Sequence, residues 1–426
     1  MKGLLHHVLL PLTLLVGTIC SAETTFTAGN LSYTILSEDD ATVSVKGTAS
    51  TSGDIIIPGE VEYNSKKYTV TKIASQGFSE NNNITSVVVP ATINTMGGGA
   101  FYKCTNLTNI AIHPASNITT INNEFVSGCS KLETITLSSH VSTIKTEAFK
   151  GCGKLKTIIV TSNAAPTSIS STAFSGITLS NITLKVLSSN AETSFGGADY
   201  FKEMNVVVTP LTISDAADNS ETLAMYDGLV ADVVVSRKLN SGGYNSLCLP
   251  FDMSAEQIST LWSTCDIQVL SSASVSESEL VLNFSAVSSI EAGVPYLVQP
   301  TATIDGFTIQ NATLSAATHS VSDGGVSFIG VYNPTMLAAS DDIAFVSGGN
   351  TLTPSAGGEI GGLRAYFDIS GVPASAHSHA RLSFNGTPTA VSTESSSADT
   401  YTKRFEHGVL IIERNGVRYS IMGERL

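Results

Sequence analysis

Phenylalanine recurs through the first half of the chain at an almost constant interval. The five positions are 23, 24, 24 and 25 residues apart, and they are Phe78, Phe101, Phe125, Phe149 and Phe174. A fixed period in this range is typical of proteins built from stacked repeats. One such unit is too small to bury its own phenylalanine, so neighbouring units must cover one another's apolar side chains. The pattern therefore predicts a solenoid.

Other apolar positions keep the same period. A cysteine follows three of the phenylalanines after three or four residues, at Cys104, Cys129 and Cys152. An aliphatic residue comes next in every unit, at Ile84, Leu107, Leu132, Leu155 and Leu179. A strand-like triplet then follows, at 87–89, 110–112, 135–137, 158–160 and 182–184. Because a free cysteine in such a position behaves as a small buried hydrophobe, we interpret the cysteines as core residues and not as nucleophiles.

The strand-like triplets also predict which residues face solvent. Side chains alternate along a strand, so the middle residue of each triplet and its two flanking residues should point outward. The candidate partner-binding residues are Ser86, Asn109, Ala111, His113, Thr134, Thr136, Thr157, Ile159, Asn181 and Thr183; Val88, Pro90, Ser138, Thr161 and Lys185 complete the grid. Five strands about 4.8 Å apart would span roughly 20 Å, which fits a protein loop or a short glycan. A merely solvated sheet, in which strand propensity favours threonine, is the alternative.

The segment from Ile55 to Val208 resembles the BspA-like leucine-rich repeats. The resemblance rests on Ile93–Leu107 and Val141–Cys152, and on the lead-in segments Asp54–Pro58 and Tyr68–Ile73. Members of that family are typically surface or secreted bacterial proteins implicated in adhesion to host matrix proteins or to other cells. The resemblance therefore implies an extracellular binding protein, without a fixed ligand. The unit at Phe174 departs from the pattern because it lacks the cysteine, and the Asn122–Phe125 segment is irregular.

From about Leu211 the period disappears. Short apolar runs separated by Gly, Pro, Asn and Ser clusters predict many short strands, as in a β-sandwich. A short helix is expected after Ser254, where Gln257 completes a capping box. The segments 244–251, 292–298 and 364–367 resemble a module found in repeat-bearing secreted proteins of similar bacteria, and this resemblance implies no activity.

The two ends of the chain carry different signals. Lys2, an apolar run from Leu4 to Ile19 and a small residue at Ala22 predict a secretory signal peptide. Ile19 argues against a lipoprotein signal at Cys20, which needs a small residue before the cysteine. Near the other end, Asn415-Gly416 between two apolar runs predicts a β-hairpin, which either closes a domain or forms part of a sorting signal.

The expected fold is therefore mainly β, a leucine-rich-repeat solenoid followed by a β-sandwich-like domain and a C-terminal hairpin. The expected division is a signal peptide (1–22), N-terminal capping strands (23–54), the solenoid (55–209), an all-β sandwich-like module (210–390), a linker (391–400) and a hairpin tail (401–426).

Charge and motifs narrow the possible functions. A net charge of −14 without a basic stripe argues against nucleic acid. No segment after the signal is apolar over the roughly 18 residues that a membrane span requires. The zinc-protease, phosphate-loop and nucleophile-elbow motifs are missing from the sequence, which argues against an enzyme and a cofactor. Neither the pair His377 and His379 nor the group Asp215, Asp218 and Asn219 completes a metal-site pattern. Whether Cys248 and Cys265 form a disulfide stays open.

The leading hypothesis is a secreted or cell-surface adhesion protein that binds an extracellular protein, on host matrix or another cell, through the solenoid sheet. The alternative is a glycan-binding protein that uses the Asn/Thr-rich sheet or the second β-domain. Glycan hydrolysis by the second domain is the least favoured hypothesis, and the sequence leaves it open because a catalytic carboxylate pair is assembled in three dimensions.

Overall fold

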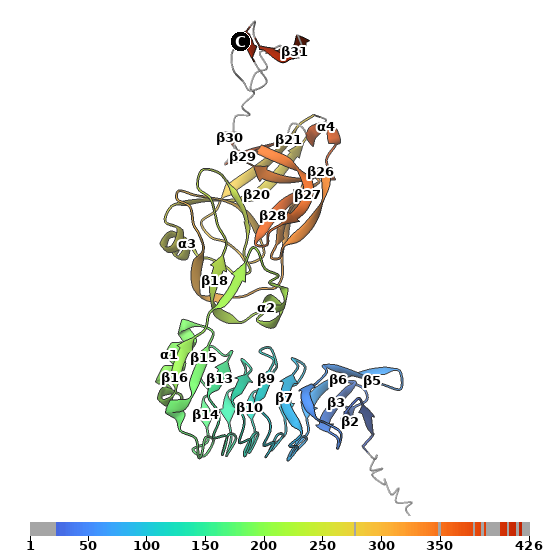
Figure 1. The fold of residues 1–426 in the computed structure, drawn as a ribbon, viewed down its shortest axis with the longest axis vertical. Coiled ribbons are helices and arrows are strands. Elements are labelled where there is room, and N and C mark those ends of the chain that lie inside the picture. Colours follow the sequence, from blue (N-terminus) through green and yellow to red (C-terminus); the bar gives the residue numbers. More distant parts are fainter. Residues whose placement is uncertain are drawn as a thin grey trace, which may run out of the picture. The chain divides into compact units, whose positions relative to one another are not determined.

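The computed structural model describes residues 23–276, 278–346, 351–377 and 380–384 in full, and of residue 347 only the backbone. Beyond these it describes only the backbone of four strands, β30 (Thr387–Pro388), β31 (Tyr401–Glu406), β32 (Val409–Arg414) and β33 (Val417–Tyr419). The predicted signal peptide and the linker at 391–400 lie outside the described residues. The chain divides into two compact units, Met1–Thr209 and Pro210–Leu426 (Figure 1).

The first unit begins with a twisted sheet of mixed strand directions. Its strands run in the order β1-β2-β3-β6-β5, and the short β8 pairs with β6. Their bounds are β1 (Thr25–Ala28), β2 (Leu31–Ser37), β3 (Thr42–Gly47), β5 (Glu60–Tyr63), β6 (Lys66–Ile73) and β8 (Thr95–Met96). Phe26 stacks on Tyr33 and Tyr63 with ring centroids 5.3 and 4.3 Å apart. This sheet shares one continuous core with the repeats, so it covers the first unit of the solenoid.

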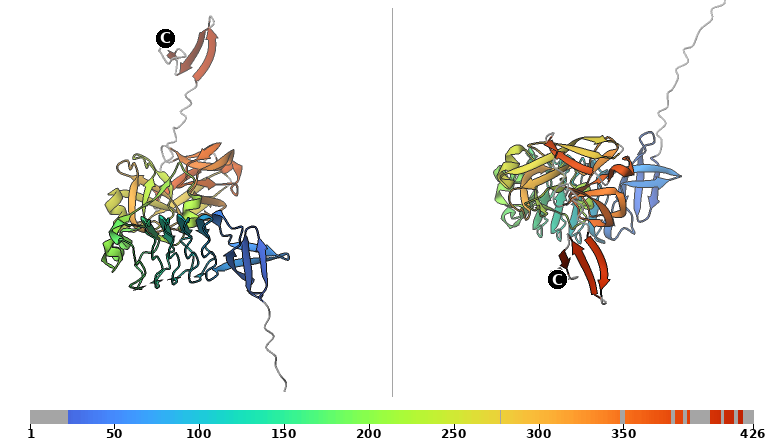
Figure 2. Two further views of the ribbon diagram at one scale, coloured as in Figure 1. Left: turned by 60° about the horizontal axis from the view of Figure 1, so that its bottom comes forward. Right: turned by 90° about the horizontal axis from the view of Figure 1, so that it is seen from above.

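The repeats form a seven-stranded parallel sheet in the order β16-β15-β13-β11-β9-β7-β4 (Figures 1 and 2). Its strands are β4 (Gly53–Ile56), β7 (Ile84–Val89), β9 (Asn109–Ile112), β11 (Thr134–Leu137), β13 (Thr157–Val160), β15 (Thr183–Val186) and β16 (Asn205–Val208). A second parallel ladder joins β10 (Thr120–Ile121), β12 (Thr143–Ile144) and β14 (Ser168–Ile169). The predicted mainly β solenoid is confirmed.

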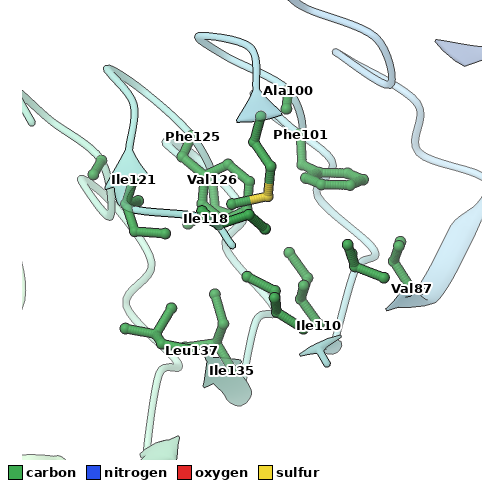
Figure 3. Packing of buried hydrophobic residues seen from close by; sticks show 14 of the residues in the cluster. Val87, Ala100, Phe101, Ile110, Ile118, Ile121, Phe125, Val126, Ile135 and Leu137 are labelled. Carbon is green, nitrogen blue, oxygen red and sulfur yellow. The ribbon is translucent and has the colours of Figure 1, made fainter. Parts of the chain in front are cut away.

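The recurring phenylalanines lie in the core between these layers. Ring centroids are 5.2 Å apart for Phe78 and Phe101, and 5.6 Å apart for Phe101 and Phe125. Figure 3 shows Phe101 and Phe125 in the same interior as Ile110 and Ile135, which point inward from neighbouring strands. Stacking of successive units therefore removes each aromatic ring from water, as the period predicts.

The cysteines form a second buried row. The Sγ atom of Cys104 donates to the carbonyl oxygen of Phe78 at 2.9 Å, and that of Cys129 donates to the carbonyl oxygen of Phe101 at 3.0 Å. Cys152 Sγ donates in the same way to Val126 at 3.1 Å. Each thiol therefore satisfies a carbonyl group of the preceding unit, and the interpretation of these cysteines as core residues is confirmed.

Each unit turns at a residue with a left-handed backbone. Gly128 and Gly151 have φ angles of +81° and +75°, and Lys103 occupies the equivalent position with a φ of +52°. Their amides donate to the next unit, from Gly128 to Lys150 at 2.7 Å and from Gly151 to Ser175 at 3.1 Å. Glycine adopts this conformation without the steric penalty of a Cβ atom. The turns of successive units are therefore joined by backbone hydrogen bonds, as the strands are.

A short helical segment closes the last repeats. Helix α1 (Ser189–Gly197) is capped by Ser188, whose side chain accepts from the amide of Ala191, and it buries Phe195. The 3-10 helix η2 (Phe201–Glu203) buries Phe201, whose ring centroid is 5.1 Å from that of Phe195. These two rings cover the final turn, which has no further repeat to shield it.

The second unit is also mainly β. A small sheet joins β17 (Leu211–Ser214), β18 (Val230–Ser236) and β23 (Phe307–Thr313). A larger sheet runs in the order β19-β22-β20-β21-β29-β27-β26-β28-β25-β24, with β30 paired to β29. Its strands are β19 (Asn245–Cys248), β20 (Cys265–Val275), β21 (Leu280–Ala286), β22 (Pro295–Pro300), β24 (Ser320–Asp323), β25 (Val326–Val331), β26 (Thr335–Ser347), β27 (Thr351–Ile360), β28 (Arg364–Asp368) and β29 (Ala380–Phe384).

Aromatic contacts show that this larger sheet curls on itself. Phe284 of β21 lies 6.2 Å from Phe328 of β25 between ring centroids, although the two strands are well separated in the sheet order. Phe328 stacks on Phe367 of β28 at 4.3 Å. Because the sheet curls, side chains from distant strands meet on its inner face and form the core. A single curled sheet thus encloses this core, where a simple sandwich would use two separate sheets.

In the described part of this unit three helices accompany the strands, α2 (Ser220–Met225), α3 (Ala255–Trp262) and α4 (Ala374–His377). The predicted capping box is present at α3, where Ser254 accepts from the amide of Gln257 and the Gln257 side chain accepts from the amide of Ser254. Near the end of the chain, β31 and β32 pair antiparallel, and Arg414 of β32 lies opposite Val417 of β33. The predicted hairpin thus has a third strand, while its Asn415-Gly416 turn lies outside the described residues.

Cys248 and Cys265 are free thiols, so the disulfide considered from sequence does not form in this fold. The strands that carry them flank β22 on opposite sides, with Cys248 opposite Pro295 and Cys265 opposite Pro300. Two strand spacings of about 4.8 Å already exceed the roughly 7 Å between Cα atoms that a disulfide can bridge.

Removal of one ring from the phenylalanine row should destabilise the first unit strongly. We expect Phe125→Ala to lower the free energy of unfolding by about 3–5 kcal/mol, because the cavity cannot collapse between two stacked units. Val88→Ala on the exposed face should change it by less than about 0.5 kcal/mol. Urea denaturation of both variants measures the difference. Equal stability of the two variants would contradict the stacked core.

The buried thiols should resist alkylation until the protein unfolds. A hydrogen bond with Cys104 and burial raise the pKa of Cys129. Burial raises the pKa of Cys152 to about 12. A raised pKa keeps each thiol protonated at pH 8, where the reactive thiolate is then scarce. Mass spectrometry after iodoacetamide treatment should find both unmodified in the native protein and alkylated in urea. A Thr136→Cys variant supplies an exposed control thiol that should react without denaturant, and alkylation of Cys152 at the same rate would refute its burial.

Candidate functional site

The outward-facing residues of the seven-stranded sheet form two parallel rows. The first, the polar ladder, consists of Asp54, Ser86, Asn109, Thr134, Thr157, Thr183 and Asn205, each in register with the next. The second, the apolar ladder, lies two residues further along each strand and consists of Ile56, Val88, Ala111, Thr136, Ile159, Lys185 and Val207. The face therefore presents a row of hydrogen-bonding groups beside a row that is mostly aliphatic.

The apolar ladder leaves large hydrophobic side chains in contact with solvent. Ile56 is 73% exposed, Val88 is 43% exposed and Val207 is 38% exposed. Ala111 and Ile159, between them in the row, are partly exposed. Scattered apolar residues on a surface are ordinary, but five aliphatic residues in a row of seven are more typical of a surface that binds another molecule.

Most of the grid predicted from sequence lies on these two ladders. Five of its residues are in the polar ladder, namely Ser86, Asn109, Thr134, Thr157 and Thr183. Five are in the apolar ladder, namely Val88, Ala111, Thr136, Ile159 and Lys185. His113 follows directly after β9 and is half-buried, and burial lowers its pKa. Val88 and Lys185 point outward as predicted.

The predicted register of the fifth strand is wrong by two residues. Thr183 lies opposite Thr157 and Lys185 lies opposite Ile159, so the inward triplet partner of Ile158 is Leu184 and not Ile182. Asn181 belongs to the 3-10 helix η1 (Leu179–Asn181) that precedes β15, and it is not on the sheet. The longer spacing before this strand accommodates the extra helical turn.

Ser138 and Thr161 are buried, whereas the alternation rule placed them on the outer face. Both residues follow the last paired position of a strand, where the chain already turns inward. The Ser138 hydroxyl donates to the carbonyl oxygen of Ile118 at 3.2 Å, and that of Thr161 donates to Leu137 at 3.2 Å. These bonds satisfy the hydroxyl groups inside the turn, and the open face is narrower than predicted.

The sheet is also longer than predicted, because β4 and β16 add a row at each edge. Asp54 and Ile56 come from β4, and Asn205 and Val207 come from β16. Both segments alternate in the way that a strand requires. Phe201, four residues before β16, could have indicated the additional turn.

Few charges lie on this face. At one edge the Asp54 carboxylate accepts from Ser86 Oγ at 2.6 Å and from Thr85 Oγ1 at 2.7 Å, and these hydrogen bonds lower its pKa. Lys185 is the cation of the apolar ladder. Such a surface can exclude water from a partner and align hydrogen bonds with it.

The metal-site candidates use their polar groups within the protein. The ring nitrogen Nε2 of His377 lies 3.0 Å from the carbonyl oxygen of Val372, while His379 lies outside the described residues. Asp215 pairs with Arg364 at 2.9 Å, and buried Asn219 donates to the carbonyl oxygen of Tyr332 at 2.7 Å. In the described part of the chain, no three His, Cys, Asp or Glu side chains are close enough to hold a metal ion.

Within the described residues, none of the helices has both the length and the apolar character needed to cross a membrane.

Comparison with protein families matches residues 62–180 to the BspA type leucine rich repeat region, in six copies. No curated protein matches the chain. A leucine rich cell surface protein from Faecalibacterium prausnitzii is 23% identical, with a TM-score of 0.29, over 39% of this chain and 55% of its own. A leucine-rich repeat protein from Bacteroides ovatus is 19% identical, with a TM-score of 0.28, over 44% of this chain and 58% of its own. The pneumococcal vaccine antigen PcpA is 20% identical, with a TM-score of 0.28, over 45% of each chain.

This chain thus spans little more than half the length of the first two of these structures. The repeat period, the buried phenylalanine and cysteine rows and the family match all concern the same segment. Residues 62–180 therefore form a BspA type leucine-rich-repeat region.

Proposed function

We propose that this chain is a secreted or cell-surface adhesion protein that binds an extracellular protein through the exposed face of its solenoid sheet. The observation that carries this proposal is the apolar ladder, in which Ile56, Val88 and Val207 stay exposed beside a row of hydroxyl and amide groups. The centre of a protein interface is typically apolar, with polar groups at its rim. Seven strands make the ladder about 29 Å long, which is enough for a standard interface.

The composition of the face favours a protein over a glycan. Sugar rings are commonly held against the flat face of an aromatic side chain. None of the residues in the two ladders, all of which are described, is aromatic. A row of aliphatic side chains binds the apolar side chains of a protein more strongly than it binds a sugar, because hydrophobic stabilisation scales with the apolar area removed from water.

The family assignment supports binding rather than catalysis. Leucine-rich repeats generally act as non-enzymatic binding scaffolds, and the repeats here are of the BspA type. The predicted signal peptide supports an extracellular location.

Charges introduced into the apolar ladder should abolish capture of the partner. We expect a Val88→Lys/Ile159→Lys double variant to lose at least about tenfold in affinity, because each lysine must be desolvated in the interface. The unbound protein should keep its melting temperature, since surface substitutions rarely change stability by more than about 0.5 kcal/mol. Surface plasmon resonance against a panel of purified matrix proteins and glycans measures the change.

The matched control is Thr119→Lys/Ser142→Lys. It places the same charges at exposed positions directly before β10 and β12, in the second parallel sheet of the solenoid and away from both ladders. Capture should persist in this control. Equal capture by both double variants would show that the sheet face is not the binding surface. Capture of glycans alone by the unmodified protein would favour the glycan-binding alternative.

A further inference from the structure

A polar pocket of about 470 Å³ opens in the second unit between β19, β26, β27 and β28. Its walls include Tyr244, Ser246, Phe345, Glu359, Gly361 and Arg364. This volume is within the range of small-molecule sites, which usually combine apolar walls with a few polar groups that fix the ligand. The pocket belongs to neither of the two ladders, so it is independent of the proposed function.

Arg364 contributes a guanidinium group to the wall of this pocket. Its Nη2 atom donates to the Asp215 carboxylate at 2.9 Å, while its Nε atom has no hydrogen-bond partner among the described residues. The side chain is 40% exposed. Gly361 packs directly against it, since a Cβ atom there would lie 3.0 Å from Nε. Only a glycine fits this closely against the guanidinium, and this packing buries the Nε atom.

A second arginine lies behind the same wall. Arg237 is buried, and its Nη2 atom donates to the carbonyl oxygen of Ser246, a residue of the pocket. Its Nε and Nη1 atoms have no hydrogen-bond partner within the described part of the chain. Burial and the nearby charge of Arg364 lower the pKa of Arg237, whereas Asp215 opposes this effect. Burial of a guanidinium group that lacks some of its hydrogen bonds is unfavourable, and a nearby negative charge lowers this cost.

Asp215 lies beside both arginines, so these three side chains together carry one excess positive charge, while the carboxylate of Glu359 in the pocket wall is exposed and screened by water. We propose that this pocket binds the carboxylate group of a small acidic ligand, with Arg364 in direct contact and Arg237 supplying charge from behind Ser246. A guanidinium matches the planar, two-oxygen geometry of a carboxylate. Tyr244 and Phe345 offer the apolar walls for the remainder of the ligand.

The exposed carboxylate of Glu359 at the pocket favours a monoanion over a dianion such as phosphate. A second negative charge on the ligand would add repulsion without meeting a further cation, because the excess charge of the arginines is already neutralised by the first.

Calorimetric titration of the full chain with glucuronate and with glucose tests the proposal. The two probes share a ring and differ in the carboxylate, so glucuronate should bind and raise the melting temperature, whereas glucose should do neither. N-acetylglycine, which carries the same group on a peptide unit, separates a sugar acid from a peptide carboxylate as the source. Binding of either carboxylate supports the site, whereas binding of neither, or of inorganic phosphate in preference to both, overturns it.

Substitution of the arginines locates the binding. Arg364→Gln should weaken carboxylate binding by about tenfold or more, because it removes a charge-assisted hydrogen bond. The matched control is Arg381→Gln, since Arg381 pairs with Glu279 at 2.6 Å in the same unit and does not line the pocket. Arg237→Met should also weaken binding while the melting temperature of the free protein stays equal or rises. If Arg237→Met fails to fold, the comparison of Arg364→Gln with Arg381→Gln decides, and equal affinities for those two variants refute the proposal.

Discussion

The solenoid depends on one constraint, which is that a single repeat cannot keep its own phenylalanine from water. Each ring is covered only when the next unit lies against it, as Phe78, Phe101 and Phe125 do at centroid separations of 5.2 and 5.6 Å. The two terminal units lack a neighbour on one side. The aromatic cluster around Phe26 covers the first, and Phe195 with Phe201 covers the last. The capping elements are therefore required by the same burial that builds the repeats.

The inward packing also determines the outer face. Once the aliphatic residues of β9, β11 and β13 are fixed inward, strand alternation places Ala111, Thr136 and Ile159 in one outward row. The outward face is thus a product of register, and a shift by one residue would exchange it for the core. The pocket beside Arg364 has a different origin, since it arises where strands distant in the sequence meet in the curled sheet of the second unit.

The sequence alone was sufficient where a residue's environment repeats. The phenylalanine and cysteine rows, the middle strands and the capping box at Ser254 all follow from local patterns, and the structure confirms them. The sequence did not predict the position of a residue where the repeat changes length, as at Asn181, or where the chain leaves a strand, as at Ser138 and Thr161. The relation of Arg237 to Arg364 depends on contacts between residues more than a hundred positions apart, for which a single sequence has no periodic signal.

The most direct test of the stacked register is a distance across the whole sheet, measured by pulsed electron resonance between spin labels at Ile56→Cys and Val207→Cys in a Cys265→Ser background. Six strand spacings predict a narrow distribution centred at roughly 29 Å, apart from the length of the labels. Moving the second label from Val207 to Lys185 should shorten the distance by about 5 Å, one strand spacing. A broad distribution, or no shortening, would contradict the account.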